Sequence, residues 1–129
     1  MNTKRIAIVD DDPNIRFFLE ESLRSMGVEQ FLFAEDGAQI LDLAKKELPD
    51  LIIMDVGMPS MNGLTTLRHL KEAPETKEIP VMIISGRGNF SHLTELGPNG
   101  AAAVLPKPFS HRQLVSESMR LLSAACPAA

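Results

Sequence analysis

Short runs of apolar residues constrain the fold of this chain more than any other feature. Three of them show no alternation of apolar and polar residues, which is typical of strands buried on both faces of a parallel sheet. We therefore predict a strand at each run. The runs cover residues 6–9, 31–34, 51–54 and 81–84, with a weaker fifth at 101–105.

The segments between the runs carry the 3.6-residue apolar spacing of amphipathic helices. The first helix is predicted to begin at Pro13, with Asp12 as its N-cap, and to stop at Gly27. A second helix ends before Pro49, and a fourth, weaker pattern covers residues 90–96. Apolar residues with this spacing in the first three helices are Ile15, Phe18, Leu19, Leu23, Met26, Ile40, Leu41, Ala44, Leu48, Leu64, Leu67 and Leu70.

The last helix has a defined start. Ser110 and Gln113 have the spacing of a capping box, in which each side chain binds the other residue's backbone N–H. Phe109 and Leu114 have the spacing of the hydrophobic staple that often accompanies it. The apolar face is predicted to continue through Val115, Met119 and Leu122.

Five strands that alternate with helices predict an α/β fold. Right-handed βα crossovers place helices on both faces of a parallel, doubly wound sheet. A chain of 129 residues, with 44% hydrophobic and 23% charged residues, has the size and composition of one globular domain. We therefore expect residues 1–129 to form a single (βα)5 domain.

Net charge and cysteine content argue against a nucleic-acid-binding protein and against a disulfide-bonded one. The net charge of −4 disfavours direct nucleic-acid binding, which usually requires a basic surface. Cys126 is the single cysteine, so no internal disulfide can form, and we expect a reducing, cytoplasmic location. The first apolar run is too short for a signal peptide, and no stretch is long enough to span a membrane.

Polar and charged residues follow four of the predicted strands. Asp10 and Asp11 come after the first, Asp55 after the third, Ser85 after the fourth and Lys107 after the fifth. Functional groups of open parallel sheets gather at the carboxyl ends of the strands, near the point where strand order reverses. These side chains are therefore expected to converge on one edge.

Clustered carboxylates, a hydroxyl and an ammonium point to phosphoryl chemistry. Mg²⁺ is normally held by one or two protein carboxylates together with water and phosphate oxygens. A lysine and a hydroxyl nearby stabilise the oxygens of a phosphoryl group. A carboxylate in this setting could itself act as the nucleophile that accepts phosphorus.

The sequence resembles the receiver domain of two-component response regulators from about residue 4 to 122. The segments VDDDPNI, PDLIIMDVGMPSMNGL, IPVMIISG and LPKPF match its signature regions in order. Asp55 and Ser85 are 30 residues apart, and Ser85 and Lys107 are 22 apart, as is usual in that family. The resemblance implies a flavodoxin-like strand order, 2-1-3-4-5, and a phosphorelay signalling switch rather than a metabolic enzyme.

The resemblance also implies a mechanism and a metal site. Asp55 would attack the phosphohistidine of a sensor histidine kinase, or of a histidine phosphotransfer protein, and become an aspartyl phosphate. Mg²⁺ would be held by Asp11, Asp55 and the backbone carbonyl of Gly57, while Asp10 would orient a coordinated water.

Two further side chains would bind the phosphoryl group in a receiver domain. Lys107 would bind one phosphoryl oxygen, and the Ser85 hydroxyl would turn inward to bind another. The bond between Lys107 and Pro108 is expected to be cis. The effector is unknown, membrane binding is not expected, and a homodimer through the fourth helix, fifth strand and fifth helix is possible.

One position departs from the family pattern. Receiver domains usually carry Tyr or Phe three residues before the motif lysine, and here that switch position is Val104. A β-branched side chain has a stiff χ1 and cannot rotate as an aromatic lever does. Gly57 and Arg87 stand at positions that tune phosphate lifetime, and their expected effects oppose each other.

Two alternative functions follow from these residues. Val104 leaves open a binding module that keeps the fold but works through protein contacts without phosphate. A Mg²⁺-dependent phosphohydrolase of the haloacid dehalogenase type would use Asp10 as its nucleophile. The second alternative is weakened by Asn14, because those enzymes usually carry Thr or Val at that place, and by the lack of room for a substrate cap.

Overall fold

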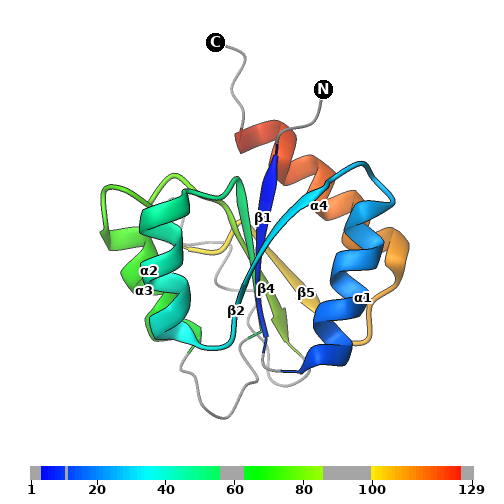
Figure 1. Cartoon of the computed structure of the whole chain (residues 1–129), viewed down its shortest axis with the longest axis horizontal. Helices are drawn as coiled ribbons and strands as arrows, with labels where there is room; N and C mark the ends of the chain where they lie inside the picture. The colour runs from blue at the N-terminus through cyan, green and yellow to red at the C-terminus, as the bar shows by residue number, and fades with distance from the viewer. Residues whose placement is uncertain (1–3, 11, 56–62, 86–99, 126–129) are drawn as a thin grey trace.

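Five parallel strands form one sheet in the order β2-β1-β3-β4-β5 (Figure 1). The computed structural model describes residues 4–10, 12–55, 63–85 and 100–125. The observed order confirms the predicted α/β fold. The strands are β1 (Arg5–Val9), β2 (Gln30–Ala34), β3 (Leu51–Asp55), β4 (Val81–Ser85) and β5 (Ala103–Pro106).

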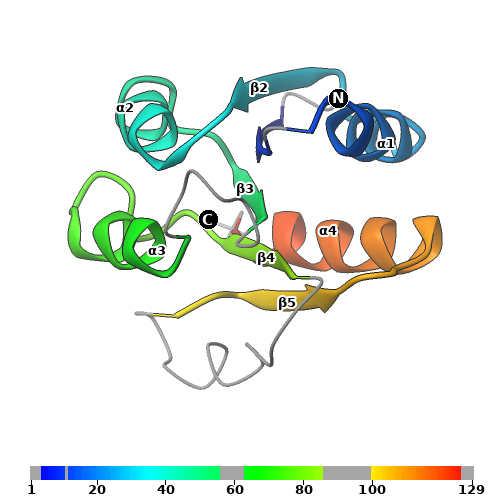
Figure 2. The same ribbon diagram turned by 90° about the horizontal axis from the view of Figure 1, so that it is seen from below.

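Helices cover both faces of this sheet, as Figure 2 shows. α1 and α4 lie on one face, and α2 and α3 lie on the other. β1, β3 and β4 are almost wholly buried between the two layers, so their apolar side chains supply both halves of the core. The helices are α1 (Pro13–Arg24), α2 (Gly37–Glu47), α3 (Gly63–Glu72) and α4 (His111–Ala125).

The predicted helix starts are confirmed. Asp12 caps α1, because its Oδ1 accepts the backbone N–H of Asn14 at 2.9 Å. The capping box of α4 is complete: Gln113 N–H donates to Ser110 Oγ at 3.0 Å, and Ser110 N–H donates to Gln113 Oε1 at 2.8 Å. Local side-chain chemistry thus sets where these helices begin.

Several predicted details differ in the structure. β5 begins at Ala103 rather than at residue 101, because alanine favours strands weakly and the chain bends at Ala102. Met119, predicted to continue the apolar face of α4, is 52% exposed, whereas Ser118 is fully buried against the sheet. The predicted helix at 90–96 lies outside the described residues.

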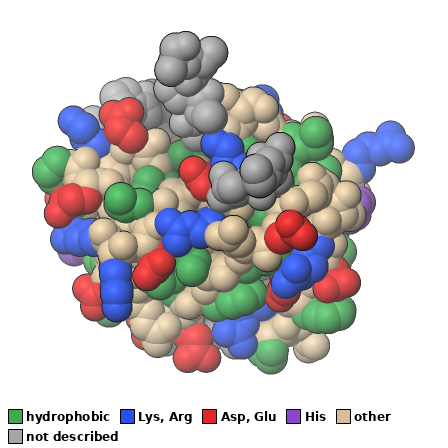
Figure 3. Space-filling view, turned by 45° about the horizontal axis from the view of Figure 1, so that its top comes forward, with side chains coloured by type: hydrophobic (Ala, Val, Ile, Leu, Met, Phe, Trp, Pro, Cys, Tyr) green, Lys and Arg blue, Asp and Glu red, His purple; other side chains and the backbone are tan. Residues whose placement is uncertain are grey.

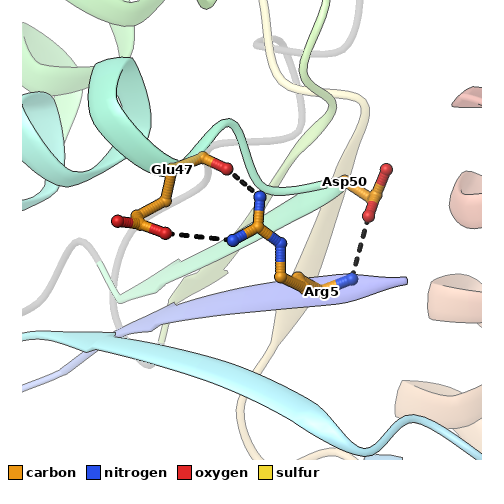
Figure 4. A network of polar contacts seen from close by, with 3 residues as sticks. All are labelled: Arg5, Glu47 and Asp50. Atoms are coloured by element: carbon orange, nitrogen blue, oxygen red, sulfur yellow. Dashed lines mark hydrogen bonds and ion pairs between the residues drawn. The ribbon is translucent and has the colours of Figure 1, made fainter. Parts of the chain in front are cut away.

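A polar network joins the amino-terminal ends of β1 and β3 to the end of α2 (Figure 4). The backbone N–H of Arg5 donates to Asp50 Oδ2 at 2.8 Å, and Asp50 N–H donates to the Arg5 carbonyl at 2.8 Å. The guanidinium binds both the side chain and the carbonyl of Glu47, the last residue of α2. A cation is favourable there because the final carbonyls of a helix are unsatisfied and carry partial negative charge.

The outer surface mixes both signs of charge. Figure 3 shows basic and acidic side chains interspersed with hydrophobic ones over the face that it presents. Within the described segments, every helix is too short or too polar to cross a membrane.

We expect Ser118→Ala to raise the free energy of unfolding by about 1 kcal/mol, because a buried hydroxyl without a partner retains its desolvation cost. Ser118 Oγ is buried and has no hydrogen-bond partner within the described segments. Ser116→Ala on the same helix is the control: that serine is exposed, so it gains only helix propensity, about 0.5 kcal/mol or less. Urea denaturation measures both variants, and equal gains would contradict the prediction.

Candidate functional site

The sheet register places two carboxylates side by side. Val9 of β1 pairs with Met54 of β3. Asp10 follows the first of these residues and Asp55 the second, so both aspartates stand at the same level of the sheet. Strand order reverses between β1 and β3, which makes this the point where ligands bind in open parallel sheets.

The next two strands extend this line of polar groups. Ser85, the last residue of β4, pairs with Pro106 of β5, and Lys107 follows immediately. The backbone N–H of Lys107 donates to the Ser85 carbonyl at 2.8 Å, which continues the ladder by one bond. The structure therefore gathers Asp10, Asp55, Ser85 and Lys107 at one edge, although they are distant in sequence.

An ion pair links two of these residues. Lys107 Nζ lies 2.6 Å from Asp55 Oδ2, and the side chains are 29% and 8% exposed. Charge-assisted bonds of this length are among the stronger polar contacts in proteins. Because Asp55 is nearly buried, Lys107 supplies positive charge to a carboxylate that water reaches poorly.

Asp10 is more deeply buried and less well satisfied. Only 1% of it is exposed, and its Oδ1 accepts the Asp12 N–H at 2.9 Å. Its Oδ2 is buried and has no hydrogen-bond partner among the described residues. Burial raises the pKa of the Asp10 carboxyl from 3.8 to about 6. The Asp12 N–H and the Lys107 ammonium lower this pKa, while the Asp55 carboxylate raises it further.

The donor set fits a hard divalent cation. Two adjacent carboxylates, one with a buried oxygen that no described residue hydrogen-bonds, offer the oxygen ligands that Mg²⁺ prefers. Within residues 4–10, 12–55, 63–85 and 100–125, no three acidic, histidine or cysteine side chains form a metal cluster. Asp11 and Gly57, the other predicted ligands, lie outside those residues.

Val104, at the predicted switch position, lies among the described residues. Val104 pairs with Ile83 across the β4–β5 ladder and packs, half-buried, against the core cluster between the sheet and α2 and α3. Its side chain fills less of that space than an aromatic ring would. The Lys107–Pro108 bond is cis, as expected.

Sequence reasoning missed one contact near the site. Phe18, expected on the apolar face of α1, is 39% exposed. Its ring lies 5.9 Å from the ring of Phe109, which follows the Lys107–Pro108 pair, with the ring planes tilted by 54°. Helical spacing placed Phe18 on the apolar face of its helix, but it could not show that the ring packs against Phe109, 91 residues away.

Comparison with known proteins identifies relatives over nearly the whole chain. The family model described as the response regulator receiver domain matches residues 6–118. Response regulator MprA of Mycolicibacterium vanbaalenii is 34% identical over 123 residues, which cover 95% of this chain and 52% of MprA. MprA of Mycobacterium avium is 33% identical, with 95% and 53% covered. The chain thus spans about half the length of these curated relatives.

Solved structures show the same fold. A putative response regulator from Chloroflexus aurantiacus superposes with a TM-score of 0.82 at 31% identity, covering 95% of this chain and 99% of that one. The chemotaxis response regulator CheY4 of Vibrio cholerae gives a TM-score of 0.80 at 28% identity, with 93% and 99% covered.

We expect the stability of the metal-free protein to fall as pH rises from about 4 to about 7. The folded-state pKa of Asp10 is raised from 3.8 to about 6, so the folded state binds more protons in that window and loses this advantage as the carboxyl ionises. Asp10→Asn should abolish the loss and be more stable at pH 7 by about 2 to 3 kcal/mol. Unfolding in chelator-treated buffers tests this, and a wild-type-to-variant difference that is constant with pH would refute it.

Proposed function

This chain belongs to the family of response regulator receiver domains, and we propose that it accepts a phosphoryl group on Asp55 from a phosphohistidine of a partner protein. The observation that carries the proposal is the 2.6 Å ion pair between Lys107 Nζ and Asp55 Oδ2 at the carboxyl edge of the sheet. It places one cation beside one nearly buried carboxylate, at the sheet position where the sequence motifs of the family fall.

The proposed transfer is a nucleophilic substitution at phosphorus. An Asp55 carboxylate oxygen forms a bond to phosphorus, the P–N bond of the phosphohistidine breaks, and its electron pair returns to the imidazole nitrogen. Lys107, already at the carboxylate, would remain beside the transferred group and bind one of its oxygens. The Ser85 hydroxyl, next in line along the edge, would donate to another.

We propose that Asp10, Asp11, Asp55 and the Gly57 carbonyl hold Mg²⁺. The ion supplies positive charge that offsets the negative charge on the phosphoryl oxygens. The buried Oδ2 of Asp10, which has no donor in the described part of the chain, supports this assignment, because a buried carboxylate oxygen without a donor is costly. Asp10 would act by orienting a coordinated water from that position.

Signalling partners are part of the proposal. The donor would be a sensor histidine kinase or a histidine phosphotransfer protein, and the phosphorylated domain would control an effector. Because the chain matches about half of the length of MprA, the activity of a whole protein is not implied by this domain. A homodimer through the predicted fourth helix, β5 and the last helix, and a cytoplasmic location, remain proposals of the same kind.

Val104 supports a second candidate function. A half-buried valine in place of an aromatic residue offers no rotating lever between the phosphorylation site and the outer face. The domain could then act as a protein-binding module without phosphate. Equal partner affinity for wild type and Asp55→Asn would favour this function. The phosphohydrolase alternative is disfavoured, since the receiver model matches residues 6–118.

We expect wild type to bind beryllofluoride, a mimic of the phosphoryl group, in the presence of Mg²⁺. Asp55→Ala should lose this binding, because it removes the oxygen that beryllium bonds. Asp42→Ala is a suitable control, since Asp42 is an exposed aspartate on α2. Fluorine NMR detects the bound species. Binding that survives in Asp55→Ala, or that never appears in wild type, would reject the proposed site.

Mg²⁺ should also raise thermal stability. An ion that binds only the folded state stabilises it by mass action, by about 2.7 kcal/mol at a hundredfold excess over its dissociation constant. The gain should shrink in Asp10→Asn, whose side chain no longer contributes a negative charge. Calorimetric scans with and without millimolar Mg²⁺ measure it, and a melting temperature that the ion leaves unchanged would count against the metal site.

A further inference from the structure

The segment that carries Lys107 is fixed at both of its ends. At the β5 end, the Lys107 N–H donates to the Ser85 carbonyl at 2.8 Å. At the α4 end, Ser110 and Gln113 close the capping box. Between these points, side-chain packing also contributes to the position of the chain.

Phe109 provides that packing, and its partner comes from α1. The Phe109 ring contacts the Phe18 ring at 5.9 Å with a tilt of 54°, an arrangement that aromatic pairs favour. Phe109 also packs against the core cluster beneath α1 and α4. These two helices lie side by side on one face of the sheet in Figure 2. The Phe18 contact thus ties the lysine-bearing segment to a neighbouring helix on the same face of the sheet as α4.

Phe18 and Lys107 face the same space. A depression of about 380 Å³ is lined by Ile15, Phe18, Lys107, Pro108 and Phe109. The lysine side chain is 29% exposed, so packing does not fully enclose its four-carbon stem. Because this stem is flexible, the position of the ammonium depends on how firmly the backbone of Lys107 is held.

α1 is itself linked to the acidic side of the site. Asp12 caps the helix through Asn14, and the Asp12 N–H donates to Asp10 Oδ1 at 2.9 Å. One end of α1 therefore orients Asp10, while Phe18 in its middle contacts the segment of Lys107. α1 therefore contacts both parts of the site: the carboxylate Asp10 at the start of the helix, and the segment that carries Lys107 at Phe18.

We propose that Phe18 is a positioning residue for phosphoryl transfer, because its ring holds Phe109 and thereby keeps Lys107 at the Asp55 carboxylate. The inference rests on the proposed function. It distinguishes Phe18 from its neighbour Phe17, which is 65% exposed and has no ring partner among the described residues.

The test separates the lysine side of the site from the metal side. Beryllofluoride affinity, measured on Mg²⁺-saturated protein, depends on Lys107, whereas affinity for Mg²⁺ alone reports the carboxylates. In Phe18→Ala we expect beryllofluoride to bind about three- to tenfold more weakly, the size of one aromatic pair, and Mg²⁺ affinity to stay within about twofold.

Three further variants complete the experiment. Phe18→Tyr keeps the ring and should restore beryllofluoride affinity, and Phe17→Ala should leave it unchanged. Phe18→Leu keeps apolar bulk without a ring and should have an intermediate beryllofluoride affinity. This variant replaces Phe18→Ala in the test if the alanine variant folds poorly. In a Lys107→Ala background, Phe18→Ala should produce no additional loss, because the residue that it positions is gone.

The outcomes are distinct. If wild type fails to bind beryllofluoride, the proposed function fails and this inference fails with it. If wild type binds and Phe18→Ala binds equally well, the inference alone is wrong. Parallel losses of Mg²⁺ and beryllofluoride affinity, or an undiminished Phe18 effect in Lys107→Ala, would show general structural damage and would overturn the positioning role.

Discussion

Negative charge held in a nearly buried place is the constraint on which this domain depends. Asp10 and Asp55 leave adjacent strands at the same level, and both are removed from water. Burial raises the pKa of the Asp10 carboxyl, and the neighbouring Asp55 carboxylate raises that pKa further. Lys107 offsets part of the repulsion between the two carboxylates through its contact with Asp55. The Asp10 carboxylate keeps one buried oxygen, Oδ2, that accepts no hydrogen bond from the described residues.

The sheet creates this situation through its topology. The parallel register brings the carboxyl ends of β1, β3, β4 and β5 to one edge, so residues from four parts of the sequence meet there. The two apolar layers on either side fix that register, because a slip by one residue would turn every buried side chain to the wrong face. Hydrophobic burial thus places the charges, although it makes no contact with a phosphoryl group.

Much of this arrangement could be predicted from sequence because it follows local rules. Unbroken apolar runs gave the strands, and Asp12, Ser110 and Gln113 gave two helix starts. Other features depend on distant partners. Met119 and Ser118 both fit a helical pattern, and only packing against the sheet decided which was buried.

The contact of Phe18 with Phe109, and the approach of Arg5 to Glu47, likewise join segments that no spacing rule connects. For Asp11 and Gly57, prediction from sequence stands without a structural counterpart, since both lie outside the described residues. The sequence was therefore most informative about where strands and helices lie along the chain, and least informative about which side chains contact one another between them.

The Arg5 network has a consequence for how the domain communicates. It marks the end of the sheet opposite Asp55, where β1 begins, and α4 ends toward that same end in Figure 1. A strand of five residues spans about 17 Å, so anything joined there stands roughly a sheet's length from Asp55, the proposed phosphoryl acceptor. A message from the acceptor to such an attachment must travel along the domain's own strands and helices, which makes the rigidity of the scaffold part of the signal path.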